Sequence, residues 1–237
     1  MKPAGLESKL QVYGLHLRGV LELSDEDIRL FHFDTGEWAS IALVGNIGSS
    51  YWSIFEQSPE YKHGQLNPLD GWSRRIGEQL ADELGAKAIY PFDGPPYYPF
   101  QQWAKRADSL EQSLMGLMIH PEYGLWHSYR FGLLIPELQG STEYKPITRQ
   151  SPCESCVAQP CLSTCPVGAF ETDGYDVDSC AAYLKREPGA RCLSGGCLAR
   201  LSCPVGEKFV YRSTEHIFHL RAFLAGLQVL RHPGSAA

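Results

Sequence analysis

The chain has 237 residues, a hydrophobic content of 43% and a formal net charge of −6. This length suits one large domain or two ordinary ones, and the hydrophobic fraction is enough to form a packed core. The acidic balance excludes a broad electrostatic attraction to nucleic acid, and no stretch of about 18 uncharged apolar residues is present to span a membrane. The N-terminal segment 1–5 lacks the apolar region of a secretory signal peptide, so we expect a cytoplasmic protein.

Predicted helices and strands alternate over about residues 1–145. In chain order they are a helix over 6–15, strands over 16–23 and 39–46, a helix over 67–84, a strand over 87–92, a helix over 101–107, and two apolar runs over 116–120 and 126–135. We expect the two apolar runs to form a hairpin, because the residues from His120 to Gly124 between them have turn composition.

Two segments of this first part carry candidate binding roles. The glycine-rich turn from Gly45 to Ser50 follows a buried strand and could present backbone N–H groups to a phosphate. Its sequence matches neither the G-x-G-x-x-G dinucleotide-binding motif nor the P-loop. A tight turn with no ligand also explains these glycines. The segment from Pro91 to Phe100 is rich in proline and tyrosine. It is either a wall of a cofactor or substrate site, or a stiff connection whose rings pack on the core.

Cysteine spacing is the most informative feature of the last third of the chain. The eight cysteines, all in this part, are Cys153, Cys156, Cys161, Cys165, Cys180, Cys192, Cys197 and Cys203, and prolines follow Cys165 and Cys203. Eight thiolates are enough for two four-iron clusters, and the first run resembles the bacterial C-x2-C-x2-C-x3-C-P pattern with one gap widened to four residues. Disulfides need an oxidising compartment, and only Cys153 and Cys156 have the spacing of a zinc knuckle. We therefore favour iron–sulfur clusters.

In the bacterial pattern the last cysteine of each run ligates the other cluster. This crossing assigns Cys153, Cys156, Cys161 and Cys203 to cluster 1, and Cys165, Cys180, Cys192 and Cys197 to cluster 2. Cys180 lies in the segment 176–185, which predicts a capped helix with acidic residues in its first turn. The alternative is a single structural cysteine on that helix, which would leave cluster 2 with three protein ligands.

The residues from Met115 to His127, followed by Gly132 to Pro136, resemble the Ile-His-Pro-x-Phe-Gly-x-Trp segment of the cobalamin-processing decyanase/dealkylase family. They are also similar to the corresponding segment of epoxyqueuosine reductase, which couples a cobalamin-binding, nitroreductase-like domain to a two-cluster ferredoxin domain in the order expected here. The resemblance covers about residues 99–137 and 150–206.

The resemblance implies an α+β chain of three parts. These are a nitroreductase-like, corrinoid-binding domain over 1–147, a bacterial-type 2[4Fe-4S] ferredoxin-like domain over 148–210, and a C-terminal helix and tail over 211–237. We expect the helix, which has apolar residues at helical spacing over 214–230, to pack on the core. A homodimer interface is the alternative for this helix.

The resemblance further implies an oxidoreductase. Electrons from a low-potential donor such as ferredoxin or flavodoxin would pass through both clusters to a corrinoid, for reductive processing of cobalamin or for reduction of a substrate. The residues placed near the corrinoid are His120, Tyr97, Tyr98 and Trp126, and Asp93 is the candidate proton donor. For His120 the alternative is a turn histidine that is hydrogen-bonded to the backbone.

One departure from the reductase concerns its substrate. Epoxyqueuosine reductase continues into helical repeats that help to hold tRNA, whereas this chain ends at Ala237 soon after one predicted helix, so we do not expect tRNA as a partner. Two other functions stay open. One is a ferredoxin-type electron-transfer protein that docks to a redox partner. The other is a flavin-dependent reductase in which the turn from Gly45 to Ser50 holds the phosphate of flavin mononucleotide (FMN).

Overall fold

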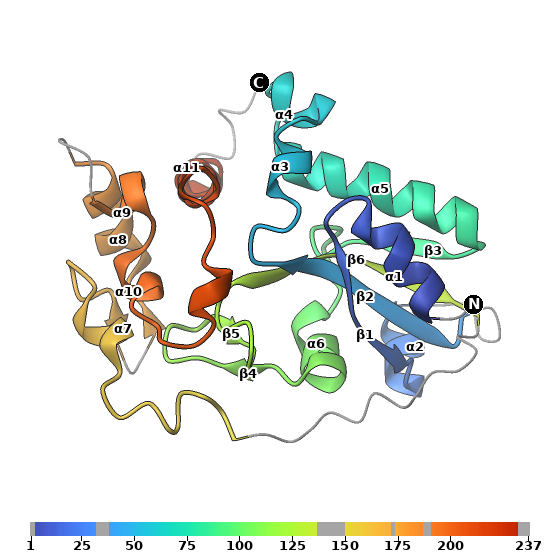
Figure 1. The fold of residues 1–237 in the computed structure, drawn as a ribbon, viewed down its shortest axis with the longest axis horizontal. Coiled ribbons are helices and arrows are strands. Elements are labelled where there is room, and N and C mark those ends of the chain that lie inside the picture. Colours follow the sequence, from blue (N-terminus) through green and yellow to red (C-terminus); the bar gives the residue numbers. More distant parts are fainter. Residues whose placement is uncertain (1–2, 32–37, 137–149, 172–173, 187–190, 232–237) are drawn as a thin grey trace. The chain divides into compact units, whose positions relative to one another are not determined.

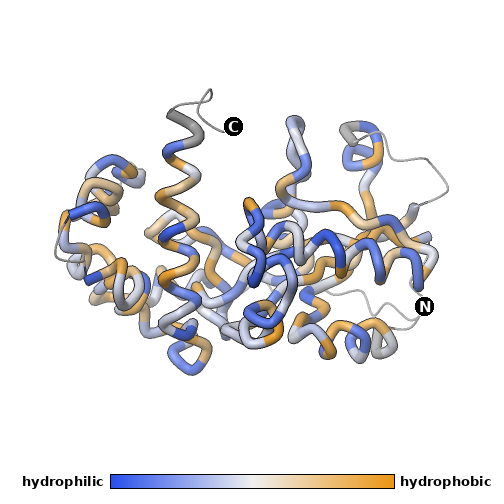
Figure 2. The backbone as a smooth tube through the Cα atoms, turned by 90° about the horizontal axis from the view of Figure 1, so that it is seen from above, coloured by the Kyte–Doolittle hydropathy of each residue, from blue (hydrophilic) through white to orange (hydrophobic). Residues whose placement is uncertain are grey.

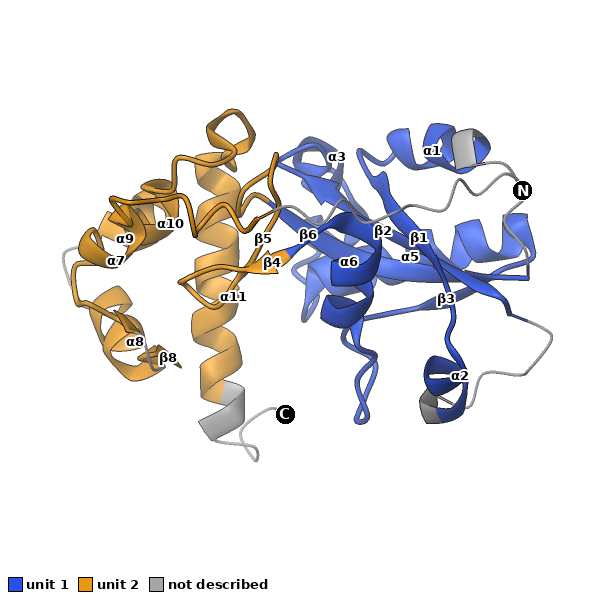
Figure 3. Cartoon of the chain, turned by 90° about the horizontal axis from the view of Figure 1, so that it is seen from below, with its two compact units in different colours: residues 1–110, 127–149 blue, residues 111–126, 150–237 orange. Residues whose placement is uncertain are grey.

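The chain forms two compact units in a computed structural model that describes residues 3–31, 38–136, 150–171, 174–186 and 191–231. Unit 1 comprises Met1–Leu110 and His127–Arg149, and unit 2 comprises Glu111–Trp126 and Gln150–Ala237 (Figure 3). Unit 2 therefore includes a segment that we had expected within the N-terminal domain. The predicted boundary between residues 147 and 148 lies outside the described residues.

Unit 1 mixes helices with an antiparallel sheet whose strand order is β1-β2-β6-β3 (Figure 1). Its elements are α1 (Pro3–Gln11), β1 (His16–Glu22), α2 (Asp25–Phe31), β2 (Ser40–Ile47), α3 (Trp52–Phe55), α4 (Pro59–Lys62), α5 (Pro68–Leu84), β3 (Lys87–Ile89), α6 (Phe100–Asp108) and β6 (His127–Ile135). Helix α5 packs against β3 and β6, and helices α1 and α6 pack against β1. The expected alternation of strands and helices is confirmed for this part of the chain.

The central strand β2 is apolar on both faces because it is covered on both. Its residues from Ser40 to Asn46 are all buried, which explains a continuous apolar run in place of alternation. Beside it, helix α5 presents a buried stripe that includes Trp72, Ile76 and Leu80. The helix ends at Gly85, which has the left-handed φ of 62° typical of a helix C-terminus.

Unit 2 consists of short elements linked by turns. They are β4 (Glu111–Gln112), β5 (Met118–Ile119), α7 (Pro160–Ser163), β7 (Phe170–Glu171), β8 (Gly174–Tyr175), α8 (Val177–Leu184), α9 (Arg191–Gly195), α10 (Leu198–Leu201), the 3-10 turn η1 (Glu207–Phe209) and α11 (Ser213–Arg231). Figure 2 shows hydrophobic and hydrophilic residues alternating along α11, the helix that leads to the C-terminus. Its residues Leu220, Phe223 and Leu224 pack against Leu184 and Cys192, so α11 belongs to the core of unit 2.

The expected hairpin between the two apolar runs is wrong. Strand β6 pairs with β2 and β3 in unit 1, whereas β5 pairs with β4 in unit 2. The turn itself forms and is closed by an isolated bridge between His120 and Gly124, but it does not join two paired strands. The physical reason is burial: the residues from Phe131 to Ile135 are buried in the sheet, a position that a free-standing hairpin does not offer. None of the described helices is both long and apolar enough to cross a membrane.

Candidate metal centre

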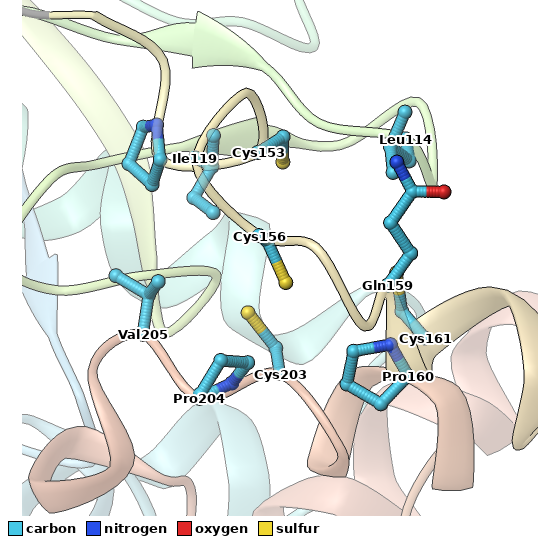
Figure 4. A pocket seen from close by; sticks show the side chains of 11 residues that line it. Leu114, Ile119, Cys153, Cys156, Gln159, Pro160, Cys161, Cys203, Pro204 and Val205 are labelled. Atoms are coloured by element: carbon cyan, nitrogen blue, oxygen red, sulfur yellow. The ribbon is translucent and has the colours of Figure 1, made fainter.

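The first group of thiols lines a cavity within unit 2. Residues around the cavity are Leu114, Ile119, Pro152, Cys153, Cys156, Gln159, Pro160, Cys161, Cys203, Pro204 and Val205. The side chains of Cys156 and Cys203 point toward one another across it (Figure 4). The empty space measures about 300 Å³ and is partly open to solvent. These four cysteines are the set that the crossed spacing assigns to cluster 1.

Thiols of this group also affect one another's pKa. Burial raises the pKa of the Cys161 thiol, and the thiols of Cys203, Cys153 and Cys156 raise it further. Burial also raises the pKa of Cys203, with Cys153 and Cys156 adding to the effect. Burial is the larger cause of both shifts, and the neighbouring thiols add to it because negative charges close together disfavour ionisation.

Local backbone geometry explains how a loop brings the thiols together. Gln159 has a left-handed φ of 40°, and Pro160 begins helix α7 at a position where the missing N–H costs nothing. Cys161 is the second residue of that helix. The widened gap of the cysteine pattern thus holds the turn that starts α7 and carries Cys161 toward the cavity.

The remaining four thiols form a second group. Burial raises the pKa of the Cys197 thiol to about 11, and Cys192 and Cys180 contribute. The pKa of Cys192 is raised by burial and by Cys165 and Cys180. Burial also raises the pKa of Cys180, and Cys165 adds to that effect. Cys180 packs against the apolar cluster that includes Cys192. The predicted N-cap of its helix is confirmed: the Asp176 carboxylate accepts from the backbone N–H of Ser179 at 3.0 Å.

An apolar cluster lies against thiols of both groups. Its buried members are Met115, Ile119, Leu125 and Ala199. The cysteines packed against it are Cys153, Cys161, Cys165, Cys197 and Cys203. Sequence reasoning did not find Met115, Ile119 or Leu125, because their segment precedes the cysteines and was interpreted as part of the N-terminal domain.

The donor set fits iron–sulfur clusters by its chemistry. Each group offers four thiols in largely apolar surroundings, and backbone N–H groups donate to several sulfur atoms. The N–H of Ala169, for example, lies 3.3 Å from the Sγ of Cys165. Within the described ranges, no three His, Cys, Asp or Glu side chains are arranged around a single metal ion. The first group instead surrounds the cavity of Figure 4.

The residues expected near a corrinoid divide between the two units: Tyr97 and Tyr98 lie in unit 1, as does Asp93, the candidate proton donor. The carboxylate of Asp93 is hydrogen-bonded and ion-paired with Arg74. The side chain of Tyr97 is 62% exposed. The ring of Tyr98 stacks on Trp103 with centroids 6.1 Å apart, and burial raises the pKa of its hydroxyl.

His120 and Trp126 lie in unit 2. The Nδ1 atom of His120 accepts from the backbone N–H groups of Glu122 and Tyr123 at 3.0 and 3.1 Å, and its ring stacks on the Tyr123 ring. These are the contacts of the alternative considered above, a turn histidine bonded to the backbone. Trp126 is fully buried, with its ring edge-on to the ring of Tyr211.

Polar groups of the turn from Gly45 to Ser50 are used within unit 1. The Asn46 amide donates to the carbonyl of Gly48 at 2.9 Å, and the Ser50 hydroxyl donates to the carbonyl of Gly14 at 2.6 Å. A Cβ on Gly45 would lie 1.9 Å from the carbonyl oxygen of Ser128 in β6. Glycine at this position is therefore required by the close approach of two strands.

Fold and site together define a mixed α and β chain whose second unit contains all eight cysteines, four of them around one cavity. No known protein-family profile and no curated protein sequence matches the chain. Among solved structures it is similar to epoxyqueuosine reductase from Bacillus subtilis, with a TM-score of 0.48 and 14% identity over 91% of this chain and 69% of that one. It is also similar to an epoxyqueuosine reductase solved with a tRNA-Tyr epoxyqueuosine-modified stem loop, with a TM-score of 0.46 and 15% identity over the same shares. Both similarities are distant.

Proposed function

We propose that this chain is an iron–sulfur oxidoreductase that holds two [4Fe-4S] clusters and conducts electrons between them. The observation that carries the proposal is the cavity lined by Cys153, Cys156, Cys161 and Cys203, the set that the crossed spacing assigns to one cluster. Such clusters, when bound, supply one-electron redox chemistry at potentials set by hydrogen bonds to sulfur and by solvent exposure.

The protein would ligate the clusters, exclude water from them and stabilise the negative charge on their sulfur atoms. Apolar residues such as Ile119 and Ala199 cover the thiols and lower the local dielectric. Backbone N–H groups, among them that of Val205 toward Cys203, donate to the sulfur atoms. Hydrogen bonds of this kind favour the more negative, reduced state, so the fold itself raises the potentials.

Paired cysteine substitutions test the ligand sets after anaerobic reconstitution with iron and sulfide. If Cys153 and Cys203 share a cluster, the double variant C153S/C203S loses one cluster and keeps about four of about eight irons. The matched double variant C153S/C165S then damages both clusters and keeps few irons. The reverse pattern would refute the crossed assignment, and a wild-type chain that takes up no iron would refute the function.

For the electron acceptor we infer a corrinoid, on the strength of the sequence resemblance of residues 115–136. The candidate contacts are His120 and the tyrosines Tyr97 and Tyr98; Trp126, being buried, would act by supporting its neighbours. Titration of the reconstituted chain with cob(II)alamin, followed by electron paramagnetic resonance, tests this inference. A changed cobalt signal that saturates at one equivalent supports it, and an unchanged signal refutes it.

Two alternatives are separated by the same titration. Binding of FMN, seen as a perturbed yellow absorbance band, would favour a flavin-dependent reductase. Uptake of about eight irons with neither cofactor bound would favour an electron-transfer protein that docks to a redox partner. Gel filtration with ferredoxin or flavodoxin would then be the next measurement.

A further inference from the structure

Arg200 occupies a position between the two thiol groups along the chain. It lies on α10, which begins directly after Cys197 of the second group and is followed by Cys203 of the first. Helix α10 packs against α7, which carries Cys161, and against α9, which carries Cys192. The backbone N–H of Arg200 donates to the thiol of Cys197. The residue is thus attached to one group by its backbone, on the helix that contacts both.

The guanidinium of Arg200 is held on two sides by aromatic rings. It lies 4.4 Å from the ring centroid of Trp126 and 4.6 Å from that of Tyr211. One guanidinium nitrogen donates to the carbonyl of Leu125, whereas the buried Nε has no hydrogen-bond partner. Among the described residues, no carboxylate forms an ion pair with Arg200. This cation is therefore fixed in place and lacks an acidic partner in the described part of the chain.

A partly buried cation without an acidic partner is costly, and a negative charge nearby offsets that cost. The two cation–π contacts with Trp126 and Tyr211 offset part of that cost. The charge acts on its surroundings: burial lowers the pKa of His216 to about 4, and the positive charge of Arg200 contributes to that shift. The buried carboxylate of Glu215 acts on His216 in the opposite direction. The thiolates of the proposed clusters would add negative charge near Arg200, whose backbone N–H donates to Cys197.

We propose that Arg200 is a tuning residue for the two clusters, a fixed positive charge that stabilises their reduced states and raises their midpoint potentials. This inference rests on the proposed function. A positive charge favours the state with one more electron, so its removal makes reduction harder. The rings of Trp126 and Tyr211 hold the charge at a constant position and limit its screening by water.

The test is a redox titration of reconstituted protein, monitored by electron paramagnetic resonance. The wild-type chain is compared with R200M, which keeps an apolar stem and removes the charge, and with R200K, which keeps the charge. The exposed Arg221 on α11 supplies the matched control R221M. We expect R200M to keep about eight irons and to show a more negative midpoint potential for at least one cluster. We expect R200K to stay closer to the wild type and R221M to equal it.

Unchanged midpoint potentials in R200M, at full iron content, would overturn the inference. If R200M fails to take up iron, R200Q replaces it, because glutamine is neutral and still offers an N–H group to the Leu125 carbonyl. Failure of both neutral variants to load iron would show that Arg200 acts on folding, which also overturns the inference. A wild-type chain without iron would refute the proposed function instead, so the two failures are distinguishable.

Discussion

Asp27 links two helices of unit 1 through a single buried carboxylate. It accepts from the Ser24 hydroxyl at 2.7 Å, the Trp103 indole at 2.7 Å and Arg106 at 2.9 Å, and only 7% of its surface is exposed. Burial opposes ionisation, but these hydrogen bonds outweigh it and lower the pKa of Asp27 to about 2. The ionised carboxylate of Asp27 therefore links α2 to α6 by hydrogen bonds.

We expect Asp27→Asn to lower the free energy of unfolding at pH 7 by about 2 kcal/mol, since hydrogen bonds to a charged group are lost. Because the pKa of Asp27 in the folded protein lies below its usual value of 3.8, the wild-type contribution is complete above about pH 4 and declines as the pH falls toward 2. The variant lacks this decline. Urea denaturation at several pH values measures both effects. The exposed neighbour Asp25 gives the control Asp25→Asn, and equal losses in the two variants would contradict the prediction.

Prediction from sequence was most specific for single residues where spacing alone carries the chemistry. The cysteine pattern assigned two sets of four ligands, which stay a prediction; the cysteines of the first set line one cavity. It failed to foresee Arg200, because no sequence rule links an arginine on a short helix to two distant rings. Trp126 was interpreted as a cofactor contact, and only its burial reveals a packing role.

Among the elements, the turn from His120 to Gly124 and the segment around Cys203 are packed backbone against backbone. A Cβ on Gly124 would lie 1.9 Å from the carbonyl oxygen of Val205, and one on Gly206 would lie 2.4 Å from that of Tyr123. Both glycines also have left-handed φ angles, 58° and 78°. This contact fixes the chain directly after Cys203, so the turn supports the ligand loop.

We expect Gly124→Ala to destabilise unit 2 by about 3 kcal/mol or more, because backbone atoms cannot move aside as a flexible side chain can. The iron content of the first cluster should fall with it. Gly116→Ala is the matched control: Gly116 lies in the same unit with φ 75°, but a Cβ there meets nothing within 4 Å. We expect Gly116→Ala to lower the free energy of unfolding by about 1 kcal/mol, because alanine is disfavoured at a left-handed φ. Iron analysis and thermal unfolding measure both variants, and similar losses would contradict the role of the turn.

Secondary structure was predicted well where periodicity is long and helix ends carry caps. Helices α5, α8 and α11 were expected at nearly their observed bounds. Strand pairing was harder to predict, because the sequence of an apolar strand does not determine which other strand it pairs with. The residues from His127 to Ile135 formed a plausible hairpin arm, yet long-range burial selected β2 and β3 as partners.

For the molecule as a whole, the two units should respond differently to loss of iron. Thiol ligation would stabilise unit 2, since metal binding and folding are coupled, whereas the sheet of unit 1 contains no cysteine. After chelation of reconstituted protein, we expect faster amide exchange in α8 and α10 and unchanged exchange in β2 and β6. Hydrogen–deuterium exchange with mass spectrometry measures this. Equal acceleration in both units would contradict the prediction.

The path of the chain between the units has a consequence for synthesis on the ribosome. Strand β6 leaves the ribosome before the first cysteine, so unit 1 can complete its sheet while unit 2 holds only residues 111–126. At that point the contacts of three apolar side chains with Ala199 and Tyr211 cannot yet form, because those two residues have not been synthesised. The side chains are Met115, Leu125 and Trp126. The nascent protein therefore passes through a stage with a complete sheet and an exposed apolar segment, and a chaperone would matter most at this stage.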